Sequence, residues 1–265
     1  MTCPPPSVCS DMNTVVSPAA LRAVEAPGAA LASPVEIPQY LWQYYDWAYV
    51  HPHGIRRFDR AWVTNLILWG NFGRLRDAAA AELGVPIAGR ALQIACVYGD
   101  FTQTLVRRLS PEAWLDVIDV VPDQLENLAA KLSPADRVGL HRSDAMDLPF
   151  EDATFDRIVV FFLIHEQPRG VRTRTLAEAW RALRPGGRLV LVDYHRPAWW
   201  HPLRYVFGPV LRKLEPFAQD LWERDLTTWL PPETAAAPRA HRLFFGGLYQ
   251  MLTIDRSASI AADGR

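Results

Sequence analysis

The sequence predicts an α/β fold in which a mostly parallel, doubly wound sheet carries helices on both faces. Three observations support this prediction. From Arg90 onward, apolar strand-like runs alternate with helix-like segments. The run Phe155–Leu163 is apolar almost throughout, which is typical of a strand buried on both faces. Near the C-terminus, Gly246-Gly247 separates two short strand-like runs, as in a tight hairpin. Together these segments indicate seven strands, the last two forming an antiparallel hairpin.

The individual elements follow from local pattern. Strands are expected at 90–96, 114–120, 137–142, 155–163 and 188–193, and at 241–245 and 248–254 on either side of the glycine pair. Helices are expected at 101–109, 122–131 and 169–183. Pro122 suits the first turn of its helix, and Pro185-Gly186-Gly187 predicts the end of the last one.

Changes in composition divide the chain into five parts. Residues 1–37 are rich in Pro, Ala and Ser and predict a disordered leader, whereas 38–89 predict an N-terminal helical cap. Residues 90–195 form the predicted Rossmann-like core, and 240–265 the hairpin and tail that complete the sheet. Between them, 196–239 is a long insertion rich in Trp and Pro, and a connection of that length is usually a lid or binding loop.

Charge and cysteine content exclude several classes of function. The 265 residues carry a formal net charge of −1, so no global positive field attracts nucleic acid. The 3 cysteines lack the spacing of a disulfide framework or metal site, which suits a reducing compartment. No signal-peptide pattern is present, and no apolar run approaches the ~20 residues of a spanning helix. We therefore expect a cytoplasmic protein that is soluble or peripheral to the membrane.

The segment Arg90–Thr102 reads R-A-L-Q-I-A-C-V-Y-G-D-F-T, a strand that runs into a loop and a helix start. Doubly wound proteins hold a cofactor at the carboxyl end of the first strand. The loop has kept one glycine, Gly99, and carries Val97 and Tyr98 where small residues are usual. A ligand site with an altered loop is therefore predicted, although the bulky pair could also serve packing alone.

Four segments in the correct order resemble class I S-adenosylmethionine-dependent methyltransferases of the ubiquinone/menaquinone C-methyltransferase type. They are Q-I-A-C-V-Y-G-D-F-T, V-I-D-V, S-D-A-M-D-L-P-F-E-D-A-T-F-D-R-I-V and L-R-P-G-G-R-L-V-L-V-D, all between Arg90 and Asp193. Adding P-Q-Y-L-W-Q-Y-Y-D-W-A-Y-V-H-P, H-E-Q-P, V-D-Y-H-R-P and F-F-G-G-L-Y-Q, the chain from Pro38 to Ile254 resembles the rhodoquinone biosynthesis protein family.

That resemblance implies conversion of ubiquinone to rhodoquinone, in which an amino group replaces a ring methoxy group. It also implies S-adenosylmethionine as amino donor, a manganese ion, and peripheral contact with the cytoplasmic face of the inner membrane. Two alternatives stay open. One is a conventional C- or O-methyltransferase acting on a quinol precursor, and the other is a cofactor-binding or regulatory protein without catalysis.

The predicted cofactor residues lie at strand ends. Asp119 ends the second strand, where a carboxylate accepts hydrogen bonds from a ribose diol, unless it is a helix cap or surface acid. The resemblance implies adenine contacts at Asp144, Ala145 and Met146, where the alternative for Asp144 is an ordinary turn. Further cofactor contacts are expected at the following positions: Val97, Tyr98, Gly99, Asp100, Val120 and Phe162. For Asp100 a helix cap is an equal alternative.

Gln93 stands where methyltransferases of this type usually carry an acid. Removing that negative charge disfavours a protonated amine nearby, and a neutral amine is the nucleophile. The hypothesis is that Gln93 favours amination, and the alternative is that it merely packs at the end of the strand.

The predicted chemistry also involves polar residues after the fourth and fifth strands. His165 and Glu166 follow one, and Asp193 and His195 end the other, so we expect them at one sheet edge as ligands for a manganese-like ion. Such an ion would polarise a quinone carbonyl. Structural hydrogen bonding is the alternative. Tyr98, His165 and His195 are the predicted catalytic side chains, with Tyr98 able to donate a hydrogen bond to a quinone oxygen.

Aromatic residues in 40–49 and in the insertion predict a path for the quinone tail. Tyr45, Trp47 and Tyr49 are the predicted substrate contacts. Nearby basic residues could meet anionic lipid headgroups, namely Arg204, Arg212, Lys213 and Arg224. The alternative is an ordinary helical cap with solvated charges.

Overall fold

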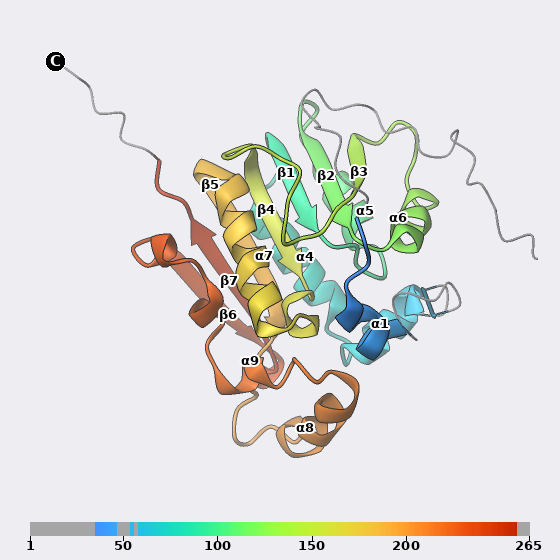
Figure 1. Ribbon diagram of the computed structural model, residues 1–265, viewed down its shortest axis with the longest axis vertical. Helices are drawn as coiled ribbons and strands as arrows, with labels where there is room; N and C mark the ends of the chain where they lie inside the picture. Colours follow the sequence, from blue (N-terminus) through green and yellow to red (C-terminus); the bar gives the residue numbers. More distant parts are fainter. Residues whose placement is uncertain (1–34, 47–53, 56–57, 259–265) are drawn as a thin grey trace, which may run out of the picture.

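The computed structural model describes residues 35–46, 54–55 and 58–258 (Figure 1). Most of the predicted leader and the predicted substrate residues Trp47 and Tyr49 lie outside the described residues. Within these residues, seven strands form one sheet in the order β3-β2-β1-β4-β5-β7-β6. They are β1 (Arg90–Ile94), β2 (Trp114–Asp119), β3 (Val138–Arg142), β4 (Phe155–Phe161), β5 (Leu183–Tyr194), β6 (Arg239–Phe244) and β7 (Tyr249–Asp255).

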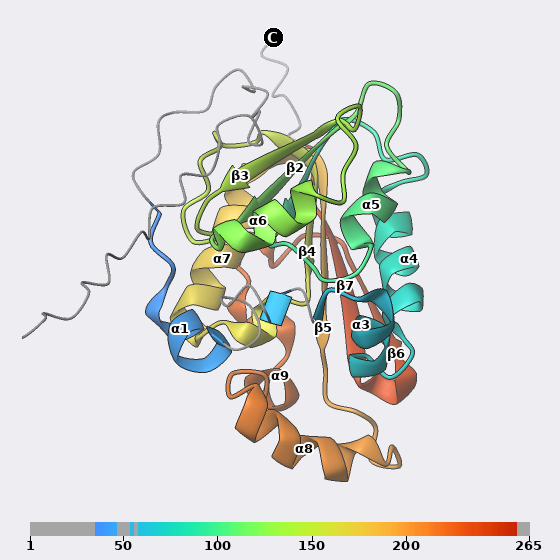
Figure 2. The same ribbon diagram turned by 90° about the vertical axis from the view of Figure 1, so that its right-hand side faces the viewer.

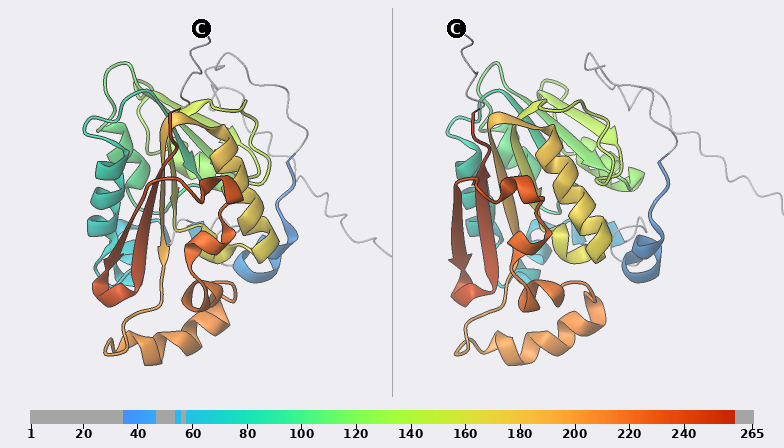
Figure 3. Two further views of the ribbon diagram at one scale, coloured as in Figure 1. Left: turned by 90° about the vertical axis from the view of Figure 1, so that its left-hand side faces the viewer. Right: turned by 60° about the vertical axis from the view of Figure 1, so that its left-hand side comes forward.

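The sheet confirms the predicted fold class. Strands β1 to β5 pair in parallel, and β7 pairs antiparallel with β5. Strand β6 pairs antiparallel with β7, so it runs in the same direction as the first five. The predicted hairpin is therefore present, but its second strand lies between β5 and β6, which leaves β6 at the edge (Figure 3).

Helices cover both faces of the sheet. They are α1 (Gln39–Tyr45), α3 (Ala61–Ile67), α4 (Phe72–Leu83), α5 (Phe101–Val106), α6 (Pro122–Ala129), α7 (Arg169–Ala182), α8 (Leu203–Leu214) and α9 (Asp220–Glu223). Helices α4 and α5 lie on one face and α7 on the other (Figure 2). Helix α4 packs directly on β4 and β5, so the predicted N-terminal cap contributes one helix to the central layers.

The burial of strand β4 accounts for its mostly apolar composition. It pairs with β1 on one side and β5 on the other, and Ile158, Val159 and Val160 are all buried. Burial on both faces favours apolar residues at these positions, whereas the two charged residues near the start of the strand have hydrogen-bond partners: Asp156 accepts from Arg90 N–H and the Arg157 guanidinium donates to Leu83 O.

Strand β5 begins earlier than predicted. The expected helix stop at Pro185-Gly186-Gly187 is part of the strand, and α7 already ends at Ala182. The C-terminal chain provides the reason, because Gly186 N–H donates to Arg256 O and Arg256 N–H donates to Gly187 O. These bonds extend the sheet across a sequence that would otherwise be a turn.

The carboxyl ends of β1 to β5 carry the remaining helices. Helices α1, α3, α8 and α9 gather at this end of the sheet (Figures 1 and 2). Among the described residues, the structure contains no helix with the length and apolar character needed to cross a bilayer. Of these helices, α1 and α3 contribute residues to the walls of two cavities.

Candidate functional site

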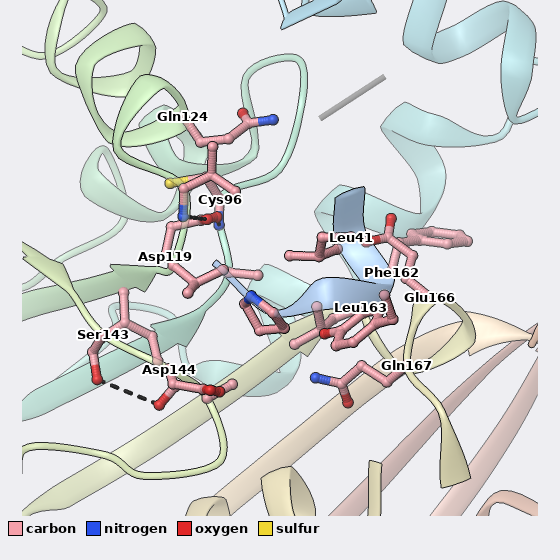
Figure 4. Close-up of a pocket in the computed structure, with 17 residues that line it drawn as sticks. Leu41, Cys96, Asp119, Gln124, Ser143, Asp144, Phe162, Leu163, Glu166 and Gln167 are labelled. Carbon is pink, nitrogen blue, oxygen red and sulfur yellow. Dashed lines mark hydrogen bonds between the residues drawn. The ribbon is translucent and has the colours of Figure 1, made fainter. Parts of the chain in front are cut away.

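Two neighbouring open cavities, each about 650 Å³, lie at the carboxyl ends of β1, β2 and β4. The first is lined by Asp119, Val120, Ser143, Asp144, Ala145 and Leu163, with Tyr40 and Leu41 of α1 (Figure 4). The second is lined by Thr64, Leu68, Phe72, Val97, Tyr98, His165, Tyr194 and Glu215. Cys96, Gln124, Phe162 and Glu166 line both. A ligand in one cavity would therefore contact a ligand in the other.

Asp119 anchors the first cavity. One carboxylate oxygen accepts a hydrogen bond from Cys96 N–H (2.8 Å) and the other from Val121 N–H (2.9 Å). Burial raises the pKa of the Asp119 carboxyl to about 6, although these hydrogen bonds work against the rise. A carboxylate offers about four lone-pair sites, so two backbone bonds leave room for two ligand hydroxyls. The position suits the predicted ribose contact.

Asp144 and its neighbours form a turn beside Asp119, since Ser143 N–H donates to Asp119 O. One carboxylate oxygen of Asp144 accepts from Met146 N–H (2.9 Å), an Asx-type turn, and Ser143 Oγ donates to Asp144 O (3.3 Å). Asp144 and Ala145 line the cavity, whereas Met146 is not among its lining residues. Of the predicted adenine contacts, the structure places the first two at the cavity.

Gln93 does not face a ligand. Its side chain is fully buried beneath the loop after β1, where its Nε2 donates to Ala95 O (3.0 Å) and its Oε1 accepts from Thr102 Oγ1 (2.9 Å). Ala95 has a positive φ of 71°, an unusual conformation for a residue with a side chain. The predicted direct contact of Gln93 with a cofactor is thus wrong, because both ends of its amide are already bonded within the protein. Gln93 holds the shape of the loop.

Gly99 and Asp100 also support the loop from behind. Gly99 has φ 87°, and a Cβ there would lie 2.8 Å from Phe72 Cζ, so glycine is required. Its N–H donates to Asp59 Oδ1 (2.9 Å). Asp100 lines neither cavity, and its side chain does not cap its helix. Both of its carboxylate oxygens instead accept from Arg76 Nη1, each at 2.7 Å. The predicted ligand contacts of both residues are therefore replaced by structural ones.

Phe162, Val97 and Tyr98 form the partition next to the second cavity. Phe162 has a positive φ of 55° and N–H bonded to Val192 O, which turns its ring toward both cavities. The Tyr98 hydroxyl accepts from Gln124 Nε2 (3.1 Å), and burial raises the pKa of Tyr98 well above its ordinary value. Tyr98 is consequently a neutral hydrogen-bonding group at the boundary between the cavities.

His165 is the charged centre of the second cavity. Its Nδ1 lies 2.9 Å from Asp193 Oδ1, and its Nε2 lies 3.7 Å from Glu166 Oε1. Burial alone lowers the pKa of the His165 imidazole, but the nearby carboxylates, Asp193 above all, outweigh burial and raise it to about 9. At neutral pH His165 is therefore an imidazolium in a mostly apolar chamber.

Glu215 completes this charged group from the insertion. It follows α8, lines the second cavity, and has a buried oxygen, Oε2, without a hydrogen-bond partner. Burial raises the pKa of Glu215, and the His165 charge opposes the rise. Tyr45 of α1 is fully buried next to Glu215, so the predicted substrate contact of Tyr45 becomes a contact with this carboxyl group.

The four predicted metal ligands do not form a site. Asp193 is fully buried behind His165 and accepts from the backbone N–H of His165 and Tyr194. His195 lines neither cavity, and its Nδ1 lies 2.8 Å from Gly247 O. The described residues contain no group of three His, Cys, Asp or Glu side chains arranged to hold a metal. Manganese therefore does not fit this arrangement, and His195 is not placed for catalysis.

Sequence reasoning missed two groups of cavity residues. Glu215 and Gln124 come from a long insertion and from the buried face of α6, and no spacing pattern links them to the first strand. Helix α3 was predicted only as part of a helical cap, yet Thr64 and Leu68 line the second cavity. The available signal for Glu215 was an acid placed directly before a proline, Glu215-Pro216, at the end of a helical segment.

Comparison with known proteins bears directly on this arrangement. Residues 91–187 match the family described as "Methyltransferase domain". Solved structures that are similar to this chain include an O-methyltransferase family protein from Burkholderia thailandensis, with a TM-score of 0.56 and 16% identity over 79% of this chain and 64% of that one. The mitomycin 7-O-methyltransferase MmcR has a TM-score of 0.58 and 19% identity over 78% of this chain and 58% of that one. This is the class I methyltransferase fold.

About half of this chain is also similar in sequence to proteins named demethylmenaquinone methyltransferase. The demethylmenaquinone methyltransferase of Lactiplantibacillus plantarum is 31% identical over 143 residues, which are 53% of this chain and 59% of that protein. The match thus spans little more than half the length of the relative.

Proposed function

We propose that this protein converts ubiquinone to rhodoquinone, with S-adenosylmethionine as amino donor in the first cavity and the quinone ring in the second. The observation that carries the proposal is the contact between the two cavities through Phe162, next to a buried His165 and Glu215. One cavity has the acidic strand ends of a nucleoside site, and the other has apolar walls with an acid–base group. Cleft-bound ligands at this edge of the sheet are the rule for such folds.

The first cavity suits S-adenosylmethionine by its donor and acceptor groups. Asp119 offers a carboxylate for the ribose hydroxyls, and Asp144 lines the same cavity after the neighbouring strand β3. The sulfonium compound would supply the amine that attacks the ring. The similarity to a demethylmenaquinone methyltransferase supports both this donor and a lipophilic quinone as acceptor.

The second cavity suits a quinone ring and its charge changes. Phe72, Phe161 and Tyr194 provide apolar walls. The His165 imidazolium would donate a hydrogen bond to a quinone carbonyl, stabilising the negative charge that forms on this oxygen when an amine adds to the ring. The Glu215 carboxylate would accept the proton from the attacking nitrogen and return it to the departing methoxide.

The displacement balances without an added oxidant. A C–N bond forms at the methoxy-bearing carbon, the C–O bond to the methoxy group breaks, and one amine proton leaves with that group as methanol. An elimination would complete the transfer: loss of a proton from the donor's β-carbon would form a double bond in the donor remnant as the bond between the nitrogen and the α-carbon breaks, and the nitrogen would take up a proton and stay on the ring as an amino group.

Val97 and Tyr98 favour amination over methylation. Both bulky side chains belong to the loop after β1 and face the second cavity. They would displace the methionine part of the donor, so that its amine rather than its sulfonium methyl meets the acceptor. Methyl transfer to a quinol is the second candidate, favoured by the name of the bacterial relative.

Location follows from the substrate. Ubiquinone is lipophilic and resides in the bilayer, so we place the protein at the cytoplasmic face of the inner membrane as a peripheral protein.

The decisive experiment follows the nitrogen atom. Purified protein is incubated with ubiquinone and S-adenosylmethionine labelled in its amino nitrogen, and the quinone is analysed by mass spectrometry. We expect a product in which a labelled amino group replaces one methoxy group, together with methanol. A parallel reaction with a labelled sulfonium methyl identifies methyl transfer. A methylated quinone overturns the amination proposal, and an unchanged quinone in the presence of bound donor favours a non-catalytic binding protein.

A further inference from the structure

Helix α3 and the chain leading into α8 expose an unusual number of large apolar side chains. We call these residues the α3–α8 surface: Trp62, Leu66, Trp69, Trp199, Trp200 and Tyr205. Each is at least 49% exposed. On α3, Trp62 and Leu66 are four residues apart and share one exposed side of the helix, and Trp69 follows just after the helix ends at Ile67. Soluble proteins rarely expose such a patch without a binding role.

The two parts of this surface are neighbours. The Trp69 ring meets the ring of Phe207 in α8 at a centroid distance of 6.3 Å. Both helices lie at the carboxyl end of the sheet (Figure 2). The opposite side of α3 lines the second cavity through Thr64 and Leu68. The exposed aromatic residues therefore stand next to the mouth of the proposed quinone cavity.

The charged residues of the same segments are all basic. No Asp or Glu occurs in residues 60–76 or 194–214, although the whole chain has a net charge of −1. Arg60 and Arg196 are exposed beside the aromatic residues of their segments. An apolar, Trp-rich surface with basic residues and no acids complements an anionic bilayer, where Trp and Tyr rings sit at the headgroup level.

The exposed residues agree only in part with those the sequence indicated. Trp199 and Trp200 belong to the Trp-rich insertion and are exposed, whereas Tyr45 is buried. Arg204 donates from its guanidinium to Pro197 O (2.7 Å) within the insertion. Trp62 and Leu66 on α3 were not singled out from the sequence.

We propose that the α3–α8 surface docks the protein on a bilayer containing anionic lipids. The aromatic side chains enter the headgroup region, the arginines pair with lipid phosphates, and the second cavity faces the membrane. The purpose of this docking, collection of a lipophilic quinone, rests on the proposed function, whereas the docking itself does not.

The test measures vesicle binding separately from activity. Full-length protein is floated with vesicles of phosphatidylethanolamine and phosphatidylglycerol, and with vesicles of phosphatidylcholine alone. The triple variant Trp62→Ser, Leu66→Ser, Trp199→Ser removes apolar area from the surface without touching the residues that line either cavity. Val85→Ser is the matched control, because Val85 is exposed at the opposite end of the sheet, before β1.

We expect the unaltered protein and the control to bind the anionic vesicles, and the triple variant to partition at least about tenfold more weakly. We also expect Arg60→Gln with Arg196→Gln to reduce the preference for anionic over neutral vesicles. Amination of a short-tailed, water-soluble quinone should not change in the triple variant, so loss of docking and failure of the proposed reaction are separate results.

Three results overturn the proposal. They are no vesicle binding by the unaltered protein, equal binding by the triple variant, and a concentration-dependent dimer in light scattering that the triple variant abolishes without any vesicle binding. The last would identify a second copy of this chain as the occupant.

Discussion

The raised pKa of Asp119 predicts a pH-dependent affinity for the nucleoside ligand. The proposed ribose contact needs an ionised carboxylate to accept two hydroxyl donors, and burial sets its pKa at about 6 in the ligand-free protein. Only the ionised fraction is competent to bind, and the apparent dissociation constant rises as that fraction falls. The direction follows from the sign of the shift: lowering the pH through 6 protonates Asp119 and weakens binding.

The magnitude follows from the same value. At pH 7 about nine-tenths of the protein is ionised at Asp119, and at pH 5 about one-tenth is, so the apparent affinity should fall by about tenfold between them. An ordinary aspartate, with a pKa near 3.9, would change the affinity by only about a tenth over that range.

The assay is isothermal titration calorimetry with S-adenosylhomocysteine, an unreactive analogue, between pH 5 and pH 8. The variant Asp119→Asn replaces one of the oxygens that accept from Cys96 N–H and Val121 N–H with a donor. Loss of a hydrogen bond to a charged group costs roughly 1.5–3 kcal/mol, so we expect binding about ten- to a hundredfold weaker at pH 7. That weaker binding should no longer depend on pH between 5 and 7.

The control is Glu112→Gln, which removes an exposed carboxyl group in the connection before β2 and should keep the full pH dependence. Thermal unfolding of each variant checks that the fold is intact. If the dissociation constant of the unaltered protein is the same at pH 5 and pH 7, the assignment of Asp119 as the titrating ligand contact is refuted.

Two further substitutions test the loop and the second cavity. Gln93→Glu replaces the donor to Ala95 O with an acceptor 3.0 Å from it, so the loop should distort and affinity for S-adenosylhomocysteine should fall about tenfold; calorimetry that shows unchanged affinity would refute the positioning role. Glu215→Gln removes the carboxylate from the second cavity only, so turnover should fall at least about tenfold while analogue binding stays the same. Equal turnover of the Glu215→Gln protein, measured by quinone mass spectrometry, would remove Glu215 from the proposed proton transfer.

The sequence by itself determined the layered fold and the ends of its strands. A parallel strand buried on both faces is mostly apolar, so β4 was visible within the run Phe155–Leu163 despite Asp156 and Arg157 near its start. Asp119 and Asp144 were predictable because parallel strands bring their carboxyl ends to one edge, whatever the details of packing. For such residues, their place at the end of a predicted strand is enough to predict that they lie at the site.

Only the tertiary structure decided where side chains point once a strand has ended. His195 follows Asp193 by two residues and would share its face in a longer strand, but β5 ends at Tyr194. The His195 N–H then bonds to Leu248 O and its ring faces Gly247 O, which removes it from the site. These partners lie more than fifty residues away, and no local pattern records them.

The same reason separates the two cavities. The first is built mainly from the residues that follow strands β1 to β4, whereas the second also depends on Glu215 and on α3, which reach it from segments outside the alternating strand–helix core. The packing of these groups against one another, rather than any spacing in the chain, sets the charge of His165. The packing of α3 likewise decides which of its side chains face solvent, Trp62 and Leu66 among them. Long-range packing determines both properties, so they became visible only when the chain was folded.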